Sequence, residues 1–286
     1  MIYCILWMDN YILNYKQQNV DSRDFKYNNV LHKDINTTKI FSLDKTKIKI
    51  YDQGKLGSCL SNAISGSIHY YNNTINPSRL YIYFNGRATS GNRSIMSDNG
   101  LTVRDGCKSV FDYHVCNEEE WVYDASSFFM MPSLNCYKNS FNFTNFIYYS
   151  INQDLDLIKS CLINGNPIIF GFIVYTSFMS VEVSKTGRVP MPSQQDNVVE
   201  NTTDHKVLGG HSSVIIGFND EEQVFQCVNS WGQKWGEGGF FYIPYQYVLD
   251  PSLAFDFTII NFNSTIPVVI PITTTKTKSN LKMQFI

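Results

Sequence analysis

Apolar residues in the first half of the chain recur every three or four positions, the spacing of one helix face. The clearest run begins at Cys59 and ends near Tyr71. Three more runs cover residues 76–88, 102–114 and 151–162. In the run 76–88, Pro77 suits the first turn of the helix. In the run 102–114, we expect a cap at Thr102 with Asp105 three residues later, and a core face of Val103, Cys107, Val110 and Phe111. The run 151–162 should end at Asn164-Gly165.

The second half changes to short apolar runs typical of buried strands. They lie at residues 167–174, 213–218, 223–229, 239–243 and 255–260. Residues 178–208 are polar and contain two prolines, which predicts a long loop. Helices first and strands second predict an α+β fold with two subdomains.

The changes in pattern divide the chain into three parts. Residues 1–45 form an N-terminal extension or short pro-segment, and residues 46–262 form one domain with a helical half (46–165) and a β half (166–262). Residues 263–286 are a polar C-terminal tail that we expect to be loosely attached.

Composition excludes several classes of function. The chain has 286 residues, 43% of them hydrophobic, and a formal net charge of −2. This charge gives no electrostatic basis for binding nucleic acid or an anionic membrane. The apolar start at residues 1–9 lacks a positive region and a cleavage site, and no run approaches the roughly 20 apolar residues of a membrane span, so we expect neither a signal peptide nor a transmembrane segment.

Cysteine usage argues against a zinc site or a disulfide scaffold. The seven cysteines are odd in number and contain no CxxC pair. We therefore expect reduced, buried thiols apart from Cys59, and no bound metal.

Three short motifs carry candidate chemistry. Gln53 precedes Cys59 by six residues, with Gly57-Ser58 directly before the cysteine. A cysteine at a helix N-terminus faces the positive end of the helix dipole, which lowers a thiol pKa. His211 follows Gly209-Gly210 and would act as the base, while Asn229, beside Ser230-Trp231, would orient its imidazole. His205 is a rival base, but it lacks these glycines and a following strand.

These motifs resemble the papain/cathepsin family of cysteine peptidases, in which cysteine, histidine and asparagine form the catalytic triad. The resemblance covers about residues 40–262, and Ser78-Arg79-Leu80-Tyr81 is similar to the branch found in bacteria and large DNA viruses. It implies a papain-like fold, with a helical subdomain, an antiparallel β-barrel-like subdomain and the active-site cleft between them. It also implies an endopeptidase that acts on polypeptides without a cofactor.

The resemblance assigns roles to individual residues. Cys59 would be the nucleophile, and the side chain of Gln53 with the N–H of Cys59 would form the oxyanion hole. Trp231 would cover the bond between Asn229 and His211. Gly100, Gly209, Gly210 and Trp231 are the candidate residues of the substrate cleft.

Two positions depart from the family pattern without removing a catalytic group. Leu56 stands where many members have a disulfide-bonded cysteine, so that bond should be absent. Leu60 stands where many members have tryptophan, so packing under the helix start should differ.

Regulation and location stay open at this point. Residues before about 45 could cross the cleft as an inhibitory pro-segment anchored by Trp7, Tyr11, Tyr15 and Phe25, or form a disordered tail. Exopeptidase, deubiquitinase-like and acyltransferase chemistry are alternatives, and so is a non-catalytic binding module. If the protein is an aminopeptidase, residues 282–286 could fill one end of its cleft. The expected location is the cytoplasm or a virion.

Overall fold

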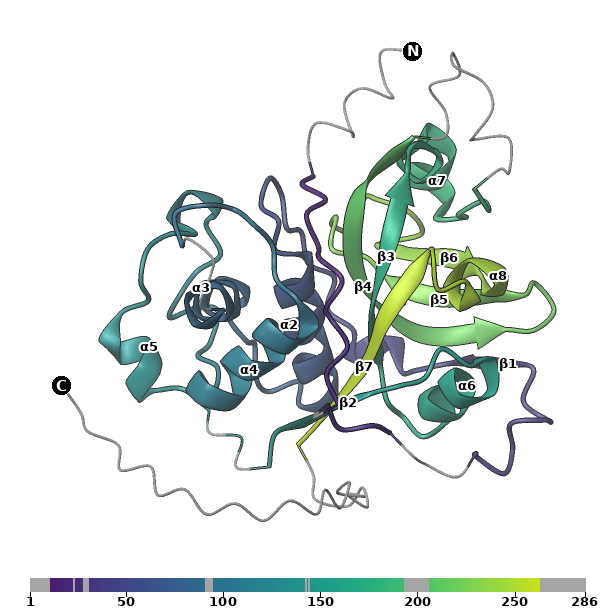
Figure 1. Cartoon of the computed structure of the whole chain (residues 1–286), viewed down its shortest axis with the longest axis horizontal. Helices are drawn as coiled ribbons and strands as arrows, with labels where there is room; N and C mark the ends of the chain where they lie inside the picture. Colours follow the sequence, from purple (N-terminus) through teal and green to yellow (C-terminus); the bar gives the residue numbers. More distant parts are fainter. Residues whose placement is uncertain are drawn as a thin grey trace.

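The computed structural model describes residues 11–22, 24–27, 31–90, 95–141, 143, 145–192 and 206–262. Helices gather in one half of the molecule and strands in the other (Figure 1). The predicted α+β fold with a helical and a β half is therefore confirmed.

Helices α2 to α5 build the helical half. Helix α2 faces the β half, and α5 lies on the far side of the helical group (Figure 1). The helices span Cys59–Tyr71 (α2), Arg79–Thr89 (α3), Val103–Tyr113 (α4) and Leu134–Lys138 (α5), with a short 3-10 helix at Ala125–Ser127.

The caps of these helices correct two details of the prediction. Ser78 accepts a hydrogen bond from the N–H of Tyr81, so α3 begins at Arg79. Pro77 therefore lies outside the helix, where it forms an isolated bridge with Asn117. The predicted cap at Thr102 is confirmed, since its hydroxyl accepts from the N–H of Asp105.

The prediction that Phe111 lies on the buried face of α4 is wrong, because its side chain is 62% exposed. Val103, Cys107 and Val110 form the buried face together with Gly106 and Ser109. Phe111 follows Val110 directly, and one residue step turns the side chain about 100° around a helix, away from that face.

One antiparallel sheet dominates the β half. Its strands lie in the order β2-β7-β3-β4-β5-β6, with β1 also paired to β4. The strands are Ile40–Ser42 (β1), Ile147–Ser150 (β2), Ile168–Tyr175 (β3), Val207–Asn219 (β4), Val224–Val228 (β5), Phe240–Pro244 (β6) and Ala254–Asn261 (β7). Helices α6 (Leu155–Ile163), α7 (Val181–Thr186) and α8 (Tyr245–Leu249) and the 3-10 helices Lys45–Lys47 and Thr176–Met179 complete the described elements.

Strand β4 begins earlier than its apolar pattern predicts. It starts at Val207 rather than Ser213, so Gly209, Gly210 and His211 belong to the strand. The predicted loop over 178–208 contains α7, and His205 lies outside the described residues.

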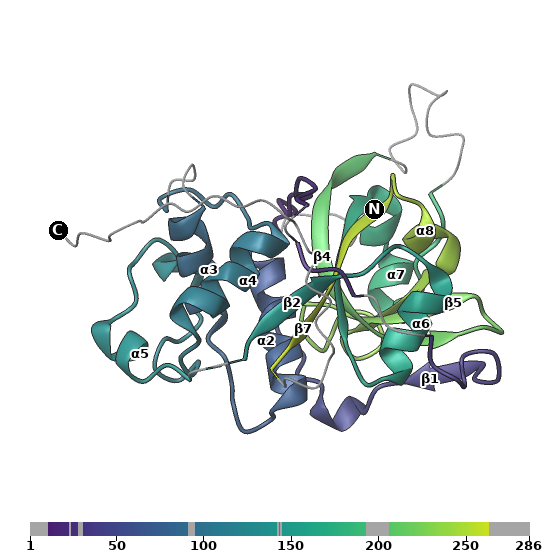
Figure 2. The same cartoon turned by 60° about the horizontal axis from the view of Figure 1, so that its bottom comes forward.

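The N-terminal segment, residues 11–22 and 24–27, passes between the two halves of the molecule. It is the dark purple trace at the centre of Figure 1, and the turned view of Figure 2 also places it between the helices and the sheet. Its backbone joins β4 through a parallel bridge of Asn14 with Gly210, and Lys26 bridges Ser150 of β2. The segment therefore lies along the boundary where the candidate catalytic residues meet.

Buried thiols and hydrophobic side chains fill the interior. The six cysteines of the described residues are free and buried, as predicted from the sequence for the five other than Cys59, while Cys4 lies outside that part. Across the described ranges, no helix is both long enough and apolar enough to span a membrane.

Candidate active site

Cys59 is the first residue of α2, and its side chain is buried. Burial raises the pKa of the thiol to about 12, while the nearby backbone N–H groups of Ser212 and Leu60 act in the opposite direction. The first turn of a helix has N–H groups without intrahelical partners, and the N–H of Leu60 is one of them. Ser212, which directly follows His211 in strand β4, lines one cavity together with Cys59, so the thiol lies close to the strand that carries the imidazole.

His211 is fully buried in β4 and paired with Asn229. Its Nε2 lies 2.9 Å from the Oδ1 of Asn229, which follows β5. Within the described part of the chain, the Nδ1 of His211 has no hydrogen-bond partner. Since Asn229 accepts at Nε2, the free Nδ1 is the nitrogen available to a neighbouring thiol.

Trp231 covers this pair, as the resemblance implied. Its ring lies 5.0 Å from the imidazole of His211, and Phe172 contacts the imidazole through a T-shaped arrangement at 5.5 Å. His211 and Asn229 are both buried, so the bond between them is shielded from solvent. A buried hydrogen bond without competing water holds the imidazole in one orientation.

Gln53 lies in the loop that leads to Cys59, tied to the segment after β5. Its N–H donates to the carbonyl of Ser230 at 2.8 Å, and its Oε1 accepts from the hydroxyl of Ser230 at 2.7 Å. The side-chain Nε2 donates to the carbonyl of Leu56 at 2.9 Å. These bonds fix the amide of Gln53 on the same side of the molecule as Asn229.

The structure thus brings the predicted residues together from three distant parts of the sequence. One cavity is lined by residues that include Cys59, Ser212 and Asn229, and Asp52 bridges Trp231 next to Gln53. His211 and Gln53 do not line this cavity, but His211 is bonded to Asn229, and Gln53 is bonded to Ser230, the next residue along the chain. The four candidate residues therefore lie close together at the boundary of the two halves.

The predicted cleft glycines lie directly under the N-terminal segment. A Cβ at Gly100 would lie 2.4 Å from the carbonyl oxygen of Asn14, and one at Gly209 would lie 2.2 Å from that of Leu13. Gly210 is equally close to the carbonyl of Tyr15. Side chains at these positions would exclude the segment, because real Cβ contacts do not reach such distances.

Burial changes the ionisation expected of the candidate catalytic pair, Cys59 and His211. Burial lowers the pKa of His211 to about 4, partly offset by its hydrogen bond to Asn229. Together with the raised thiol pKa, this gives a neutral thiol and a neutral imidazole at pH 7. The prediction of a lowered Cys59 pKa is therefore wrong for this covered form, because desolvation exceeds the effect of the helix terminus.

Sequence reasoning named Tyr15 as a possible anchor of the N-terminal segment but did not identify the residues that hold it. The hydroxyl of Tyr15 donates to the Oδ2 of Asp256 at 2.8 Å, and its ring stacks on Phe255 with centroids 6.0 Å apart. Gly171 leaves the space, since a Cβ there would lie 2.2 Å from the Tyr15 ring. These partners are far apart in sequence, and no local pattern links them.

A thiol, an imidazole–amide pair and an amide donor around one site define the class of thiol-dependent hydrolases. Comparison with known proteins gives the family. The sequence model of the papain family cysteine proteases matches residues 42–248, and the chain belongs to this family. It is a cysteine-type peptidase, and hence a hydrolase.

Viral and bacterial proteins are among its relatives. The chain is 40% identical over 237 residues to a peptidase C1-like protein of Acanthamoeba polyphaga mimivirus, covering 78% of this chain and 72% of that protein. Xylellain, a cysteine protease from Xylella fastidiosa, is 33% identical with a TM-score of 0.72, over 87% of this chain and 95% of xylellain. Procathepsin L2 from the larval midgut of Tenebrio molitor shares the fold at 15% identity and a TM-score of 0.58, over 78% of this chain and 68% of that structure.

Proposed function

We propose that the chain is an endopeptidase with Cys59 as nucleophile and His211 as general acid and base. The observation that carries this proposal is the free Nδ1 of His211, whose Nε2 is bonded to Asn229. Ser212, the next residue along the strand, lines one cavity together with Cys59. This arrangement supports proton transfer between the thiol and the imidazole.

In the proposed mechanism, the thiol proton passes to Nδ1 of His211 and the sulfur attacks the scissile carbonyl carbon. The negative charge formed on the carbonyl oxygen is stabilised by the Nε2 of Gln53 and the N–H of Cys59. Collapse of this intermediate breaks the C–N bond, and the imidazolium gives its proton to the leaving amine. Water, deprotonated by His211, then hydrolyses the thioester and restores the thiol.

The course of the N-terminal segment supports an endopeptidase rather than an exopeptidase. Tyr11 stacks on Trp231 at 4.6 Å, and seven positions later the N–H of Gln18 donates to Asp256 at 2.9 Å. The chain thus enters and leaves the cleft, so within the described residues neither end of the cleft is closed. Residues 282–286, suggested as a plug for one end, lie outside the described residues.

Peptides blocked at both termini test this mode of action. An endopeptidase cleaves them at internal bonds as fast as it cleaves the free peptides, because its cleft needs no terminal charge. Mass spectrometry of the products identifies the bonds. Cleavage that depends on a free terminus, and releases one or two residues at a time, would reject the endopeptidase and favour an exopeptidase.

We propose in addition that the N-terminal segment inhibits the enzyme. The carbonyl of Ile12 lies 3.5 Å from the Nε2 of Gln53. An oxyanion would need a distance of about 2.7–3.1 Å, so the segment occupies the proposed oxyanion site without a productive geometry. Asn14 lies over Gly57, where a Cβ would be 2.0 Å from its Oδ1, and so covers the approach to Cys59.

The bond from Tyr15 to Asp256 gives a test of this inhibition. Tyr15→Phe removes the hydroxyl and keeps the ring, and loss of a buried hydrogen bond costs about 1–2 kcal/mol. We expect peptide hydrolysis by the full chain to increase roughly 5- to 30-fold, because the covered form loses that stabilisation.

A matched control uses the exposed position at Val20, where the side chain is 99% exposed. For this control, a recognition sequence for a site-specific protease is introduced at this position in the full chain, and the folded protein is then cut there. Once the segment has been cut off and removed, the Tyr15→Phe and unaltered proteins should have equal rates, since Tyr15 leaves with the segment. Equal rates before the cut would contradict an inhibitory role for this contact.

A further inference from the structure

The loop of residues 52–58 positions both donors of the proposed oxyanion hole. It contains Gln53 and ends directly before Cys59. Gln53 lies near its start, and Ser58, the N-cap of α2, directly precedes Cys59. The side chain of Ser58 makes no capping bond to the helix. The spacing between the Nε2 of Gln53 and the N–H of Cys59 therefore depends on contacts made by this loop with its surroundings.

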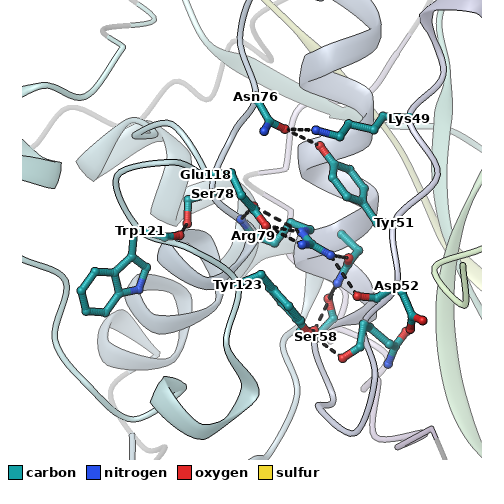
Figure 3. A network of polar contacts seen from close by, with 12 residues as sticks. Lys49, Tyr51, Asp52, Ser58, Asn76, Ser78, Arg79, Glu118, Trp121 and Tyr123 are labelled. Carbon is teal, nitrogen blue, oxygen red and sulfur yellow. Dashed lines mark hydrogen bonds and ion pairs between the residues drawn. The ribbon is translucent and has the colours of Figure 1, made fainter.

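Tyr123 makes such contacts at both ends of the loop (Figure 3). Its hydroxyl donates to the carbonyl oxygen of Gln53 at 2.8 Å and is hydrogen-bonded to the hydroxyl of Ser58. The Nδ2 of Asn62 donates to the Oγ of Ser58 at 3.1 Å. One chain of hydrogen bonds thus runs from α2 through Ser58 and Tyr123 to the backbone of Gln53.

Arg79 holds the ring of Tyr123 in place. Its guanidinium lies 3.9 Å from the ring centroid of Tyr123 and 4.5 Å from that of Tyr51, on the opposite side. Nη1 donates to the carbonyl of Asp52 at 3.0 Å and to the Oδ1 of Asn62 at 3.1 Å. The buried guanidinium thus contacts the ring of Tyr123. It also contacts Asp52, the residue before Gln53, and Asn62, the partner of Ser58.

The charge of Arg79 is balanced within the network. Its Nε lies 3.1 Å from the Oε1 of Glu118, and Nη2 pairs with the same carboxylate. The backbone N–H of Arg79 also donates to Glu118 at 3.1 Å. A buried ion pair with several hydrogen bonds has one geometry, which suits it to fixing the position of a neighbouring ring.

We propose that Tyr123 is a positioning residue for the oxyanion hole, and that the Arg79–Glu118 pair fixes Tyr123. Its hydroxyl holds Gln53 and Ser58 at a set distance, and through them the two donors that would face the developing negative charge. Such donors act only when they are held about 2.7–3.1 Å from that oxygen. This inference rests on the proposed roles of Gln53 and Cys59.

The test is Tyr123→Phe in the full chain, cut at Val20 after folding so that the cleft is open. Removing one oxyanion donor costs about 10²–10³ in kcat, so loosening a donor that remains should cost less, about 10-fold, with little change in KM. Affinity for a peptide aldehyde should fall by a similar factor, because its hemithioacetal adduct with the thiol places the former carbonyl oxygen in the same site.

Alkylation of Cys59 by iodoacetamide separates this role from a general effect on the site. The reaction displaces iodide at carbon and forms no oxyanion, so its rate should not change in Tyr123→Phe. Tyr51→Phe is the matched control: it loses a hydroxyl bonded to Asn76 at 3.3 Å on the other face of the same guanidinium. All three measurements should be unchanged in that variant.

Other outcomes would overturn the inference. If kcat and alkylation fall together, Tyr123 supports the thiol or the fold rather than the oxyanion hole; if kcat is unchanged, it positions nothing. Should Tyr123→Phe fail to fold, Ser58→Ala removes the partner at the other end of the loop and must give the same pattern. Failure of the proposed function itself would appear in the unaltered cut protein, as absence of peptide hydrolysis.

Discussion

Replacing Cys59 with alanine is expected to abolish peptide hydrolysis, with kcat falling on the order of 10⁶-fold, the scale seen when a triad nucleophile is removed. The loss follows because no other group in the site can form the thioester. Rates of peptide cleavage by cut protein, with and without the substitution, measure the effect.

Stability should change little in this variant, since Cys59→Ala removes only one small buried atom. Cys161, another free and buried thiol, lies in α6 and provides a matched control. Cys161→Ala should keep the full rate. Hydrolysis retained by Cys59→Ala, or lost in both variants, would contradict the assignment of the nucleophile.

Cutting the chain at Val20 after folding is expected to raise the rate of peptide hydrolysis about 100-fold or more. This is the change expected when the covered form outnumbers the open form by about 99 to 1 before the cut and every molecule is open after it. In the intact chain the segment is tethered, and its effective concentration at the cleft is in the mM range. After the cut it dissociates on dilution, and a solvated cleft no longer opposes ionisation of Cys59 and His211.

The uncut sample of the same protein is the control for this experiment, since the two differ by one peptide bond. Adding the isolated segment of residues 1–19 back to cut protein should restore inhibition in a concentration-dependent way. Equal rates before and after the cut, with the segment shown to be removed, would reject inhibition.

Local sequence patterns predicted much of the fold. Helical spacing identified α2, α3, α4 and α6, and short apolar runs identified β3 to β7, because each element buries one face or a continuous apolar core. The early start of β4 was missed because Gly209 and Gly210 carry no apolar side chains. The family motifs then named Cys59, His211, Asn229 and Gln53, which lie close together in the structure.

Contacts between distant residues were beyond this reasoning. Tyr15 meets Asp256 across 241 positions, and Tyr123 meets Gln53 across 70. No periodicity or motif links such pairs; tertiary packing alone brings them together. Of the anchors suggested for the segment, Tyr11, Tyr15 and Phe25 contact the domain, whereas Trp7 lies outside the described residues.

Mass spectrometry of cut and uncut protein, after brief treatment with an epoxysuccinyl peptide inhibitor at mildly acidic pH, tests the central claim most directly. The reagent requires an activated thiol beside a peptide-binding cleft. We expect one adduct per chain, located on Cys59, formed rapidly in the cut protein and slowly in the uncut protein. An adduct on another cysteine, or no adduct in either form, would contradict a Cys59-dependent peptidase covered by its own N-terminal segment.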